Sequence, residues 1–133
     1  MSLSPRLMTA AALLALTGVV HVTLGGTAVY EPLLAVSPTT ELTLYLALLW
    51  HFVTVYFALG ALGMGWAALA PTARRQTAAV IAFLGLGMGA LFLAFGLTML
   101  GEPWTAPQWI ITLVIAGLAL WPPRSPSISR AQA

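Results

Sequence analysis

From Leu42 to Ala70 the sequence reads LTLYLALLWHFVTVYFALGALGMGWAALA, without a single charged side chain. A helix needs about 20 mainly apolar residues to cross the roughly 30 Å hydrocarbon layer of a bilayer. This stretch exceeds that length and is apolar on every side, which is typical of a membrane helix and not of a soluble amphipathic one. It therefore predicts a transmembrane span that ends before Pro71.

Three further stretches of the same kind predict an all-α integral membrane protein, folded as an antiparallel four-transmembrane-helix bundle. The spans cover about 7–30, 42–70, 77–100 and 104–121. They form a single transmembrane domain over residues 1–121, followed by a short cytoplasmic tail over 122–133. In length and span count the chain resembles small four-span bacterial membrane proteins such as the DoxX-like proteins, and no motif carries over a residue role or an activity.

The composition excludes several classes of protein. Of the 133 residues, 60% are hydrophobic and only 6% are charged, and Lys, Asp and Cys are missing. About a quarter of the residues in a soluble domain are charged, so five Arg and three Glu cannot cover a soluble surface. A soluble enzyme, a nucleic-acid binder and a disordered tail protein are excluded on this ground. The missing Cys excludes a disulfide scaffold and a Cys-based redox or zinc site.

The charges predict the orientation in the membrane. The three Glu lie in the first and third loops, and the five Arg lie before span one, in the second loop or after span four: Glu31, Glu41, Glu102; Arg6, Arg74, Arg75, Arg124, Arg130. Positive charge stays on the cytoplasmic side during insertion. Both termini are therefore predicted to be cytoplasmic, in a multi-pass protein of a bacterial inner (plasma) membrane. A cleaved signal peptide over roughly the first 25 residues is disfavoured, because its apolar run is too long and no small-x-small site ends it.

Small residues at four-residue spacing mark helix faces for close approach. The third span contains Gly85 and Gly89, and the second contains Ala61 and Gly65. Helices in lipid associate through such small residues. These positions predict tight contacts within the bundle, and the alternative is a face that binds a partner helix or a flat ligand.

His21 and His51 are the candidate functional residues, because ionisable groups inside a membrane raise a functional question by default. Span one runs outward and span two inward. His21 precedes Tyr30 by nine residues and His51 follows Leu42 by nine. At 1.5 Å per residue, both imidazoles lie roughly 13 Å inside the outer boundary. If both face the bundle interior, they meet or hold something between them. Trp50, next to His51, lies too deep for the interfacial aromatic belt.

Three interpretations of the histidine pair are open. In the first, each neutral imidazole hydrogen-bonds a threonine or a backbone carbonyl, with Thr17 and Thr54 in reach. In the second, His21 and His51 bind a haem, a chlorin pigment or a quinone head. The third is a bare metal ion, for which two His without Cys or carboxylate are too few ligands, so no metal site is predicted.

The sequence predicts a non-catalytic protein. No carboxylate or Arg accompanies the histidines, which removes paired-carboxylate and Ser-His-Asp catalysis, so no catalytic residue is assigned. An ion-coupled carrier or channel is disfavoured for the same reason. We expect an accessory or structural subunit of a larger respiratory or photosynthetic membrane complex, in contact with lipid and other membrane subunits and not with nucleic acid. The alternative is an intramembrane binder of haem, pigment, quinone or another hydrophobic ligand through His21 and His51.

Overall fold

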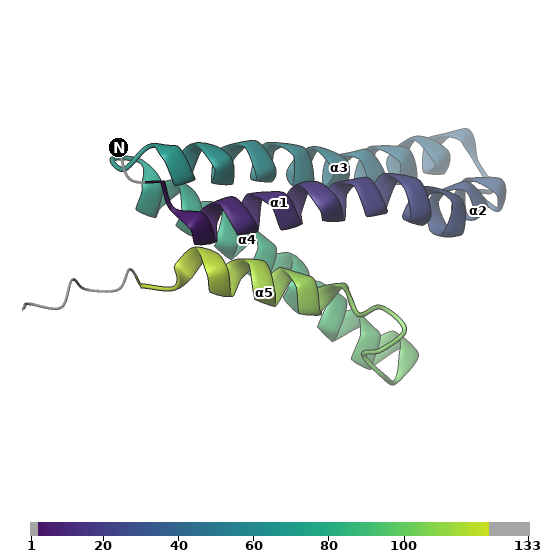
Figure 1. The fold of residues 1–133 in the computed structure, drawn as a ribbon. Helices are drawn as coiled ribbons and strands as arrows, with labels where there is room; N and C mark the ends of the chain where they lie inside the picture. Colours follow the sequence, from purple (N-terminus) through teal and green to yellow (C-terminus); the bar gives the residue numbers. More distant parts are fainter. Residues whose placement is uncertain (1–2, 123–133) are drawn as a thin grey trace, which may run out of the picture.

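The computed structural model describes residues 3–122, and this part of the chain is helical outside its loops (Figure 1). The elements in order are α1 (Pro5–Val20), η1 (His21–Tyr30), α2 (Glu31–Ala35), α3 (Thr40–Leu69), α4 (Arg74–Phe95), η2 (Gly96–Leu100) and α5 (Gln108–Leu120), where η1 and η2 are π-helical. The all-α prediction is confirmed for the described residues. The predicted tail lies outside them except for Pro122.

Three continuous helices are long and apolar enough to cross a membrane, as the first three predicted spans are. They cover Pro5–Ala35, Thr40–Leu69 and Arg74–Leu100. The span predicted over 104–121 is shorter, because α5 has 13 residues and so measures about 20 Å at 1.5 Å per residue. Its helix begins only at Gln108, since residues 101–107 form a non-helical loop.

The first loop is also shorter than predicted. The chain stays helical past Tyr30, and only residues 36–39 connect α2 to α3. Pro32 lies at the start of α2, directly after η1, where it removes one backbone donor from the continuous helix Pro5–Ala35. α3 then begins with a side-chain cap, in which the Leu42 N–H donates to the Thr39 hydroxyl oxygen at 3.1 Å.

Two helical hairpins make up the described fold. In the first, α1, η1 and α2 lie against α3. The Ser4 N–H donates to the Ala68 carbonyl at 3.1 Å, whereas Gly25 lies against the ring of Trp50. The start of α1 therefore lies near the end of α3, and η1 lies against the first half of α3. The second hairpin consists of α4, η2 and α5 (Figure 1).

The two glycines of α4 accommodate side chains from two different helices. A Cβ added at Gly85 would lie 2.9 Å from the hydroxyl of Tyr56 on α3, which itself donates to the Ile81 carbonyl at 3.4 Å. A Cβ added at Gly89 would overlap the Thr112 hydroxyl of α5. The small residues of α4 thus hold α3 and α5 close to it, in line with their predicted role within the fold.

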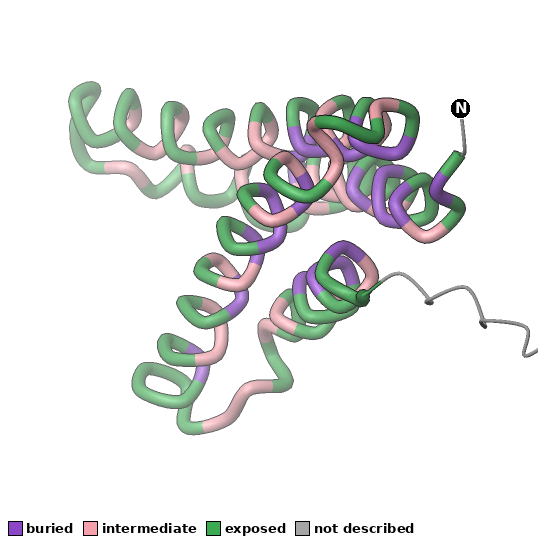
Figure 2. Tube along the Cα trace, turned by 90° about the vertical axis from the view of Figure 1, so that its left-hand side faces the viewer, coloured by how far each residue is buried: buried purple, intermediate pink, exposed green. Residues whose placement is uncertain are grey.

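The hairpins share a core near one end and diverge from it (Figure 2). That core is made of Leu7, Ala10, Ala11, Leu14, Phe57, Met64, Ala67, Ala68, Ala78, Ile81, Ala82, Ile115, Ala116 and Ala119. Between residues 21 and 50 only Gly26 is buried. The described structure is therefore more open than a bundle in contact along its whole length. We call residues 21–50, which project beyond the core, the arm.

Candidate functional site

η1 places three residues of the arm against one aromatic ring. A π-helix bonds residue i to residue i+5, so its turn is wider than an α-turn. His21, Gly25 and Tyr30, four and five residues apart, consequently lie on one face. The indole of Trp50 stacks on the imidazole of His21 at 4.0 Å and 20°, and on the ring of Tyr30 at 5.1 Å and 19°. Gly25 makes room for this indole, because a Cβ there would lie 3.0 Å from Trp50 Cη2.

Two side chains from different helices converge on the carbonyl oxygen of Trp50. His21 Nε2 lies 3.3 Å from it and Thr54 Oγ1 donates to it, also at 3.3 Å. A carbonyl only accepts, so Nε2 carries a hydrogen, and in the neutral imidazole Nδ1 is then the free acceptor. Thr17, the partner considered for His21 from the sequence, instead donates to the Leu13 carbonyl at 2.7 Å. His21 therefore hydrogen-bonds a backbone carbonyl, as in the first of the three interpretations of the histidine pair.

His51 occupies a different position in the same cluster. Its side chain is exposed on α3, and its ring meets Tyr30 edge-on at 5.6 Å and 69°. Within residues 3–122 no hydrogen bond reaches this imidazole. Tyr30 therefore brings both histidines into one group of rings, the aromatic cluster of His21, Tyr30, Trp50 and His51. A flat ligand at His21 would have to take the place that the Trp50 indole occupies.

The depth of Trp50 has a structural explanation in this cluster. The sequence places it too far from either interface for a belt residue, and the structure uses it as the central ring between helices. Stacked aromatic pairs contribute about 0.5–1.5 kcal/mol beyond their buried area. In the described part of the chain, no three His, Cys, Asp or Glu side chains come together around it.

A groove along the first hairpin was not apparent from the sequence. It has a volume of about 600 Å³ and is lined mainly by small and apolar residues of α1, η1 and α3, with Thr23 and Thr54 among them. Gly18 forms part of its wall, and a Cβ there would lie 3.0 Å from Cβ of Phe57. The signal in the sequence was the series of small residues, Ala15 and Gly18 facing Ala58 and Ala61. Such a groove is suited to an acyl or isoprenoid chain.

Glu102 organises the tip of the second hairpin. Its carboxylate accepts hydrogen bonds from the Thr105 hydroxyl, from the Trp104 N–H at 2.7 Å and from the Thr105 N–H at 2.9 Å. The Thr105 hydroxyl, followed by the Trp104 N–H, holds the pKa of Glu102 below its ordinary value. The ionised side chain thus caps the turn that precedes α5.

This geometry predicts an acid-sensitive tip. A carboxyl whose pKa is lower in the folded state stabilises the fold above its unfolded pKa, about 4.3, and this contribution is lost as the pH falls through the folded value. We expect the amide NMR signals of Trp104 and Thr105 to stay constant from neutral pH to about 4.3 and to shift below it. Glu102→Gln should remove that transition, and Glu31→Gln at the other tip should keep it. An unchanged acid transition in Glu102→Gln would contradict the assignment.

Comparison with protein-family models, with curated proteins and with solved structures finds no match for this chain.

Proposed function

We propose that the chain is a small, non-catalytic membrane protein with four transmembrane spans, which serves as an accessory subunit of a larger bacterial inner-membrane assembly, such as a respiratory or photosynthetic complex. Its three long apolar helices support the membrane assignment. The imidazole of His51 supports the accessory role, and the charges at the ends of the hairpins support the orientation.

Charge positions support the orientation. Arg6 and Arg74 lie at the end where the hairpins cross, whereas Glu31 and Glu41 flank the tip of the first hairpin and Glu102 lies at the tip of the second. Cations favour the cytoplasmic side. This distribution favours both hairpin tips on the outer side and both termini in the cytoplasm.

α5 supplies the fourth span in this proposal. It is shorter than the hydrocarbon layer, and a short span is accommodated by local thinning of the bilayer or by its flanking residues. Trp104 and Trp121, which are 65% and 68% exposed, lie on either side of α5. Their amphipathic rings are suited to the two headgroup regions.

The observation that carries the proposal is the unsatisfied imidazole of His51. It lies within the long apolar helix α3, exposed directly after the end of the arm and without a hydrogen bond from the described residues. Hydrocarbon chains offer it no partner, and polar groups inside membranes pair with one another or face protein. A polar group from a neighbouring subunit would satisfy it.

The other polar side chains of the spans make the contrast sharper. The hydroxyls of Thr17, Thr23 and Thr98 each donate to a carbonyl four residues earlier in the same helix, at 2.7–2.8 Å. His21 uses the Trp50 carbonyl. These groups are satisfied within the chain, whereas no hydrogen bond from the described residues reaches the imidazole of His51.

The groove of the first hairpin favours a second candidate function. Its volume of about 600 Å³ lies in the range of small-molecule sites, and its walls suit a hydrophobic chain. In this version, the polar head of a haem, pigment, quinone or similar ligand would reach the histidines, at the cost of moving Trp50 if it binds His21.

One experiment tests the proposal and separates it from the second candidate. A photo-crosslinking residue is placed at position 51, and a matched one at exposed Phe83 on α4. The tagged protein is then taken from its native membranes in a mild detergent. We expect position 51 to capture one stoichiometric membrane polypeptide, position 83 to capture lipid, and His51→Phe to lose that polypeptide from the purified complex.

An absorption spectrum of the same preparation tests whether the protein carries a haem or a pigment. A Soret or pigment band that disappears in His51→Phe would favour the second candidate function, ligand binding, over the subunit role. A colourless monomer with no polypeptide linked at position 51 would refute the subunit proposal and the haem and pigment versions of the second candidate.

A further inference from the structure

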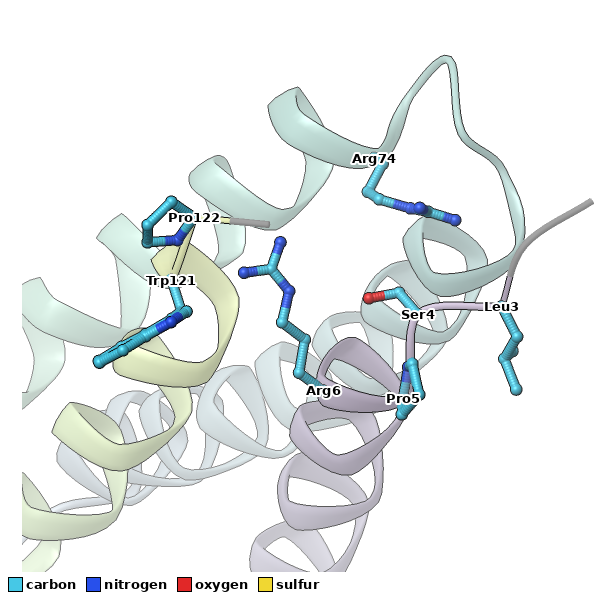
Figure 3. Close-up of a pocket in the computed structure, with 7 residues that line it drawn as sticks. All are labelled: Leu3, Ser4, Pro5, Arg6, Arg74, Trp121 and Pro122. Carbon is cyan, nitrogen blue, oxygen red and sulfur yellow. The ribbon is translucent and has the colours of Figure 1, made fainter. Parts of the chain in front are cut away.

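A cavity lies at the end of the molecule where the two hairpins cross (Figure 3). It has a volume of about 530 Å³ and is lined by residues 3–6 of the N-terminal segment, by Arg74 and by Trp121 and Pro122. Three parts of the chain that are far apart in sequence therefore meet around it. Nothing in the aromatic cluster or in the groove of the first hairpin overlaps this cavity.

Arg6 brings an unsatisfied charge into the cavity. Its side chain extends from the first turn of α1 into the space between α1, α4 and α5 (Figure 3). The Nη1 atom is buried, and no hydrogen-bond acceptor reaches it within residues 3–122. A buried donor without a partner is unfavourable, and more so when it is charged. The site therefore lacks an acceptor.

The described chain offers no carboxylate at this end. Glu31 and Glu41 belong to the tip of the first hairpin, and the carboxylate of Glu102 is engaged at the tip of the second. Two longer helices, α1 and α4, begin at the cavity without side-chain caps, so the positive ends of their dipoles add to the arginine charge. The local field attracts an anion.

We propose that this cavity binds a phosphate group. A phosphate offers several oxygen acceptors on a small anion, which match the planar donor set of a guanidinium. Trp121, on the opposite wall, is suited to the boundary between headgroups and acyl chains. The phosphate comes either from the headgroup of an anionic phospholipid or from free phosphate, and the chemistry at Arg6 is the same.

The variants follow from the geometry. Arg6→Gln removes the charge inside the cavity, and Arg75→Gln removes an equal charge from an exposed neighbour of Arg74 that does not line the cavity. Arg6→Lys keeps the charge and removes the planar donor set. These three proteins separate a specific contact from a general effect of net charge.

The first experiment tests whether the phosphate group belongs to a lipid. The full chain is reconstituted in nanodiscs of equal parts phosphatidylglycerol and phosphatidylcholine, and native mass spectrometry counts the phosphatidylglycerol retained after release. We expect Arg6→Gln to retain it about tenfold less well than the wild type, because it loses a charge-assisted hydrogen bond. Arg75→Gln should match the wild type, and Arg6→Lys should lie between the two.

The second experiment tests whether the cavity binds free phosphate. Inorganic phosphate is titrated by calorimetry into lipid-free protein in a neutral detergent. Binding that is lost in Arg6→Gln and kept in Arg75→Gln supports the site with free phosphate as its source. The proposal is overturned if the wild type retains no phosphatidylglycerol and binds no phosphate. It is also overturned if the two glutamine variants behave alike in both experiments. Where Arg6→Gln fails to fold, the comparison of Arg6→Lys with Arg75→Gln decides the outcome: weaker binding in Arg6→Lys alone supports the site, and equal binding in the two variants overturns it.

Discussion

Replacing Gly89 by valine is expected to lower the free energy of unfolding by about 3 kcal/mol, the upper part of the range for an overfilled interior. An added Cβ would overlap the Thr112 hydroxyl and lie 3.6 Å from Cα of Trp109. Thr112 is only 5% exposed, and its hydroxyl donates to the Trp109 carbonyl at 2.8 Å. The side chain has nowhere to move, so α4 and α5 must separate.

Gly87→Val is the matched control for this prediction. Gly87 lies on the same helix, and a Cβ there would have no neighbour within 4 Å. SDS titration in mixed micelles gives the midpoint of unfolding for both variants. We expect a lower midpoint for Gly89→Val alone, and equal midpoints would show that α4 and α5 are not in the contact described.

Arg74→Gln is expected to destabilise the junction of α1, α3 and α4 by about 2 kcal/mol, the scale of hydrogen bonds from a charged donor. Arg74 Nε donates to the Ala67 carbonyl at 3.1 Å and Nη2 donates to the Ala68 carbonyl at 3.0 Å. These carbonyls belong to the last turn of α3, which has no intrahelical donors for them. A positive charge there also complements the helix dipole. Glutamine is shorter and uncharged, so it replaces neither effect.

Arg75→Gln again serves as the control, because Arg75 carries the same charge in the same first turn of α4 and is exposed. Hydrogen–deuterium exchange of the last turn of α3 reports the effect locally, beside the SDS midpoint. Faster exchange confined to Arg74→Gln is the expected result. If both variants exchange alike, the loss of stability comes from the removed positive charge and not from the hydrogen bonds of Arg74 to the Ala67 and Ala68 carbonyls.

The sequence predicted the elements that follow from apolar length alone. α3 was expected over 42–70 and covers Thr40–Leu69, because its apolar run is unbroken and Pro71 ends it. The relative arrangement of the hairpins did not follow in the same way. A helix that is apolar on every side has no unique face to bury. The sequence of α3 therefore does not determine the length over which α4 packs against it.

The offsets along the sequence place the two histidines at one level of the spans, and they do not state which groups the imidazoles contact. Both histidines come to the same aromatic cluster, as the equal offsets from Tyr30 and Leu42 suggested. Their directions depend on η1, whose wider turn accommodates Trp50 over Gly25. Such a local change of helix type is decided by tertiary contacts and leaves little mark on the sequence. The sequence therefore did not show that the partner of His21 is the carbonyl of Trp50 and not Thr17.

The shared core at one end of the molecule has a consequence for the surrounding lipid. Four helices fill a narrow neck on one side, and two separate pairs occupy a wider outline on the other (Figure 2). In the proposed four-span orientation, a body of this shape would take up unequal areas in the two leaflets, and the leaflet around the hairpin tips would lose more lipid than the leaflet around the shared core.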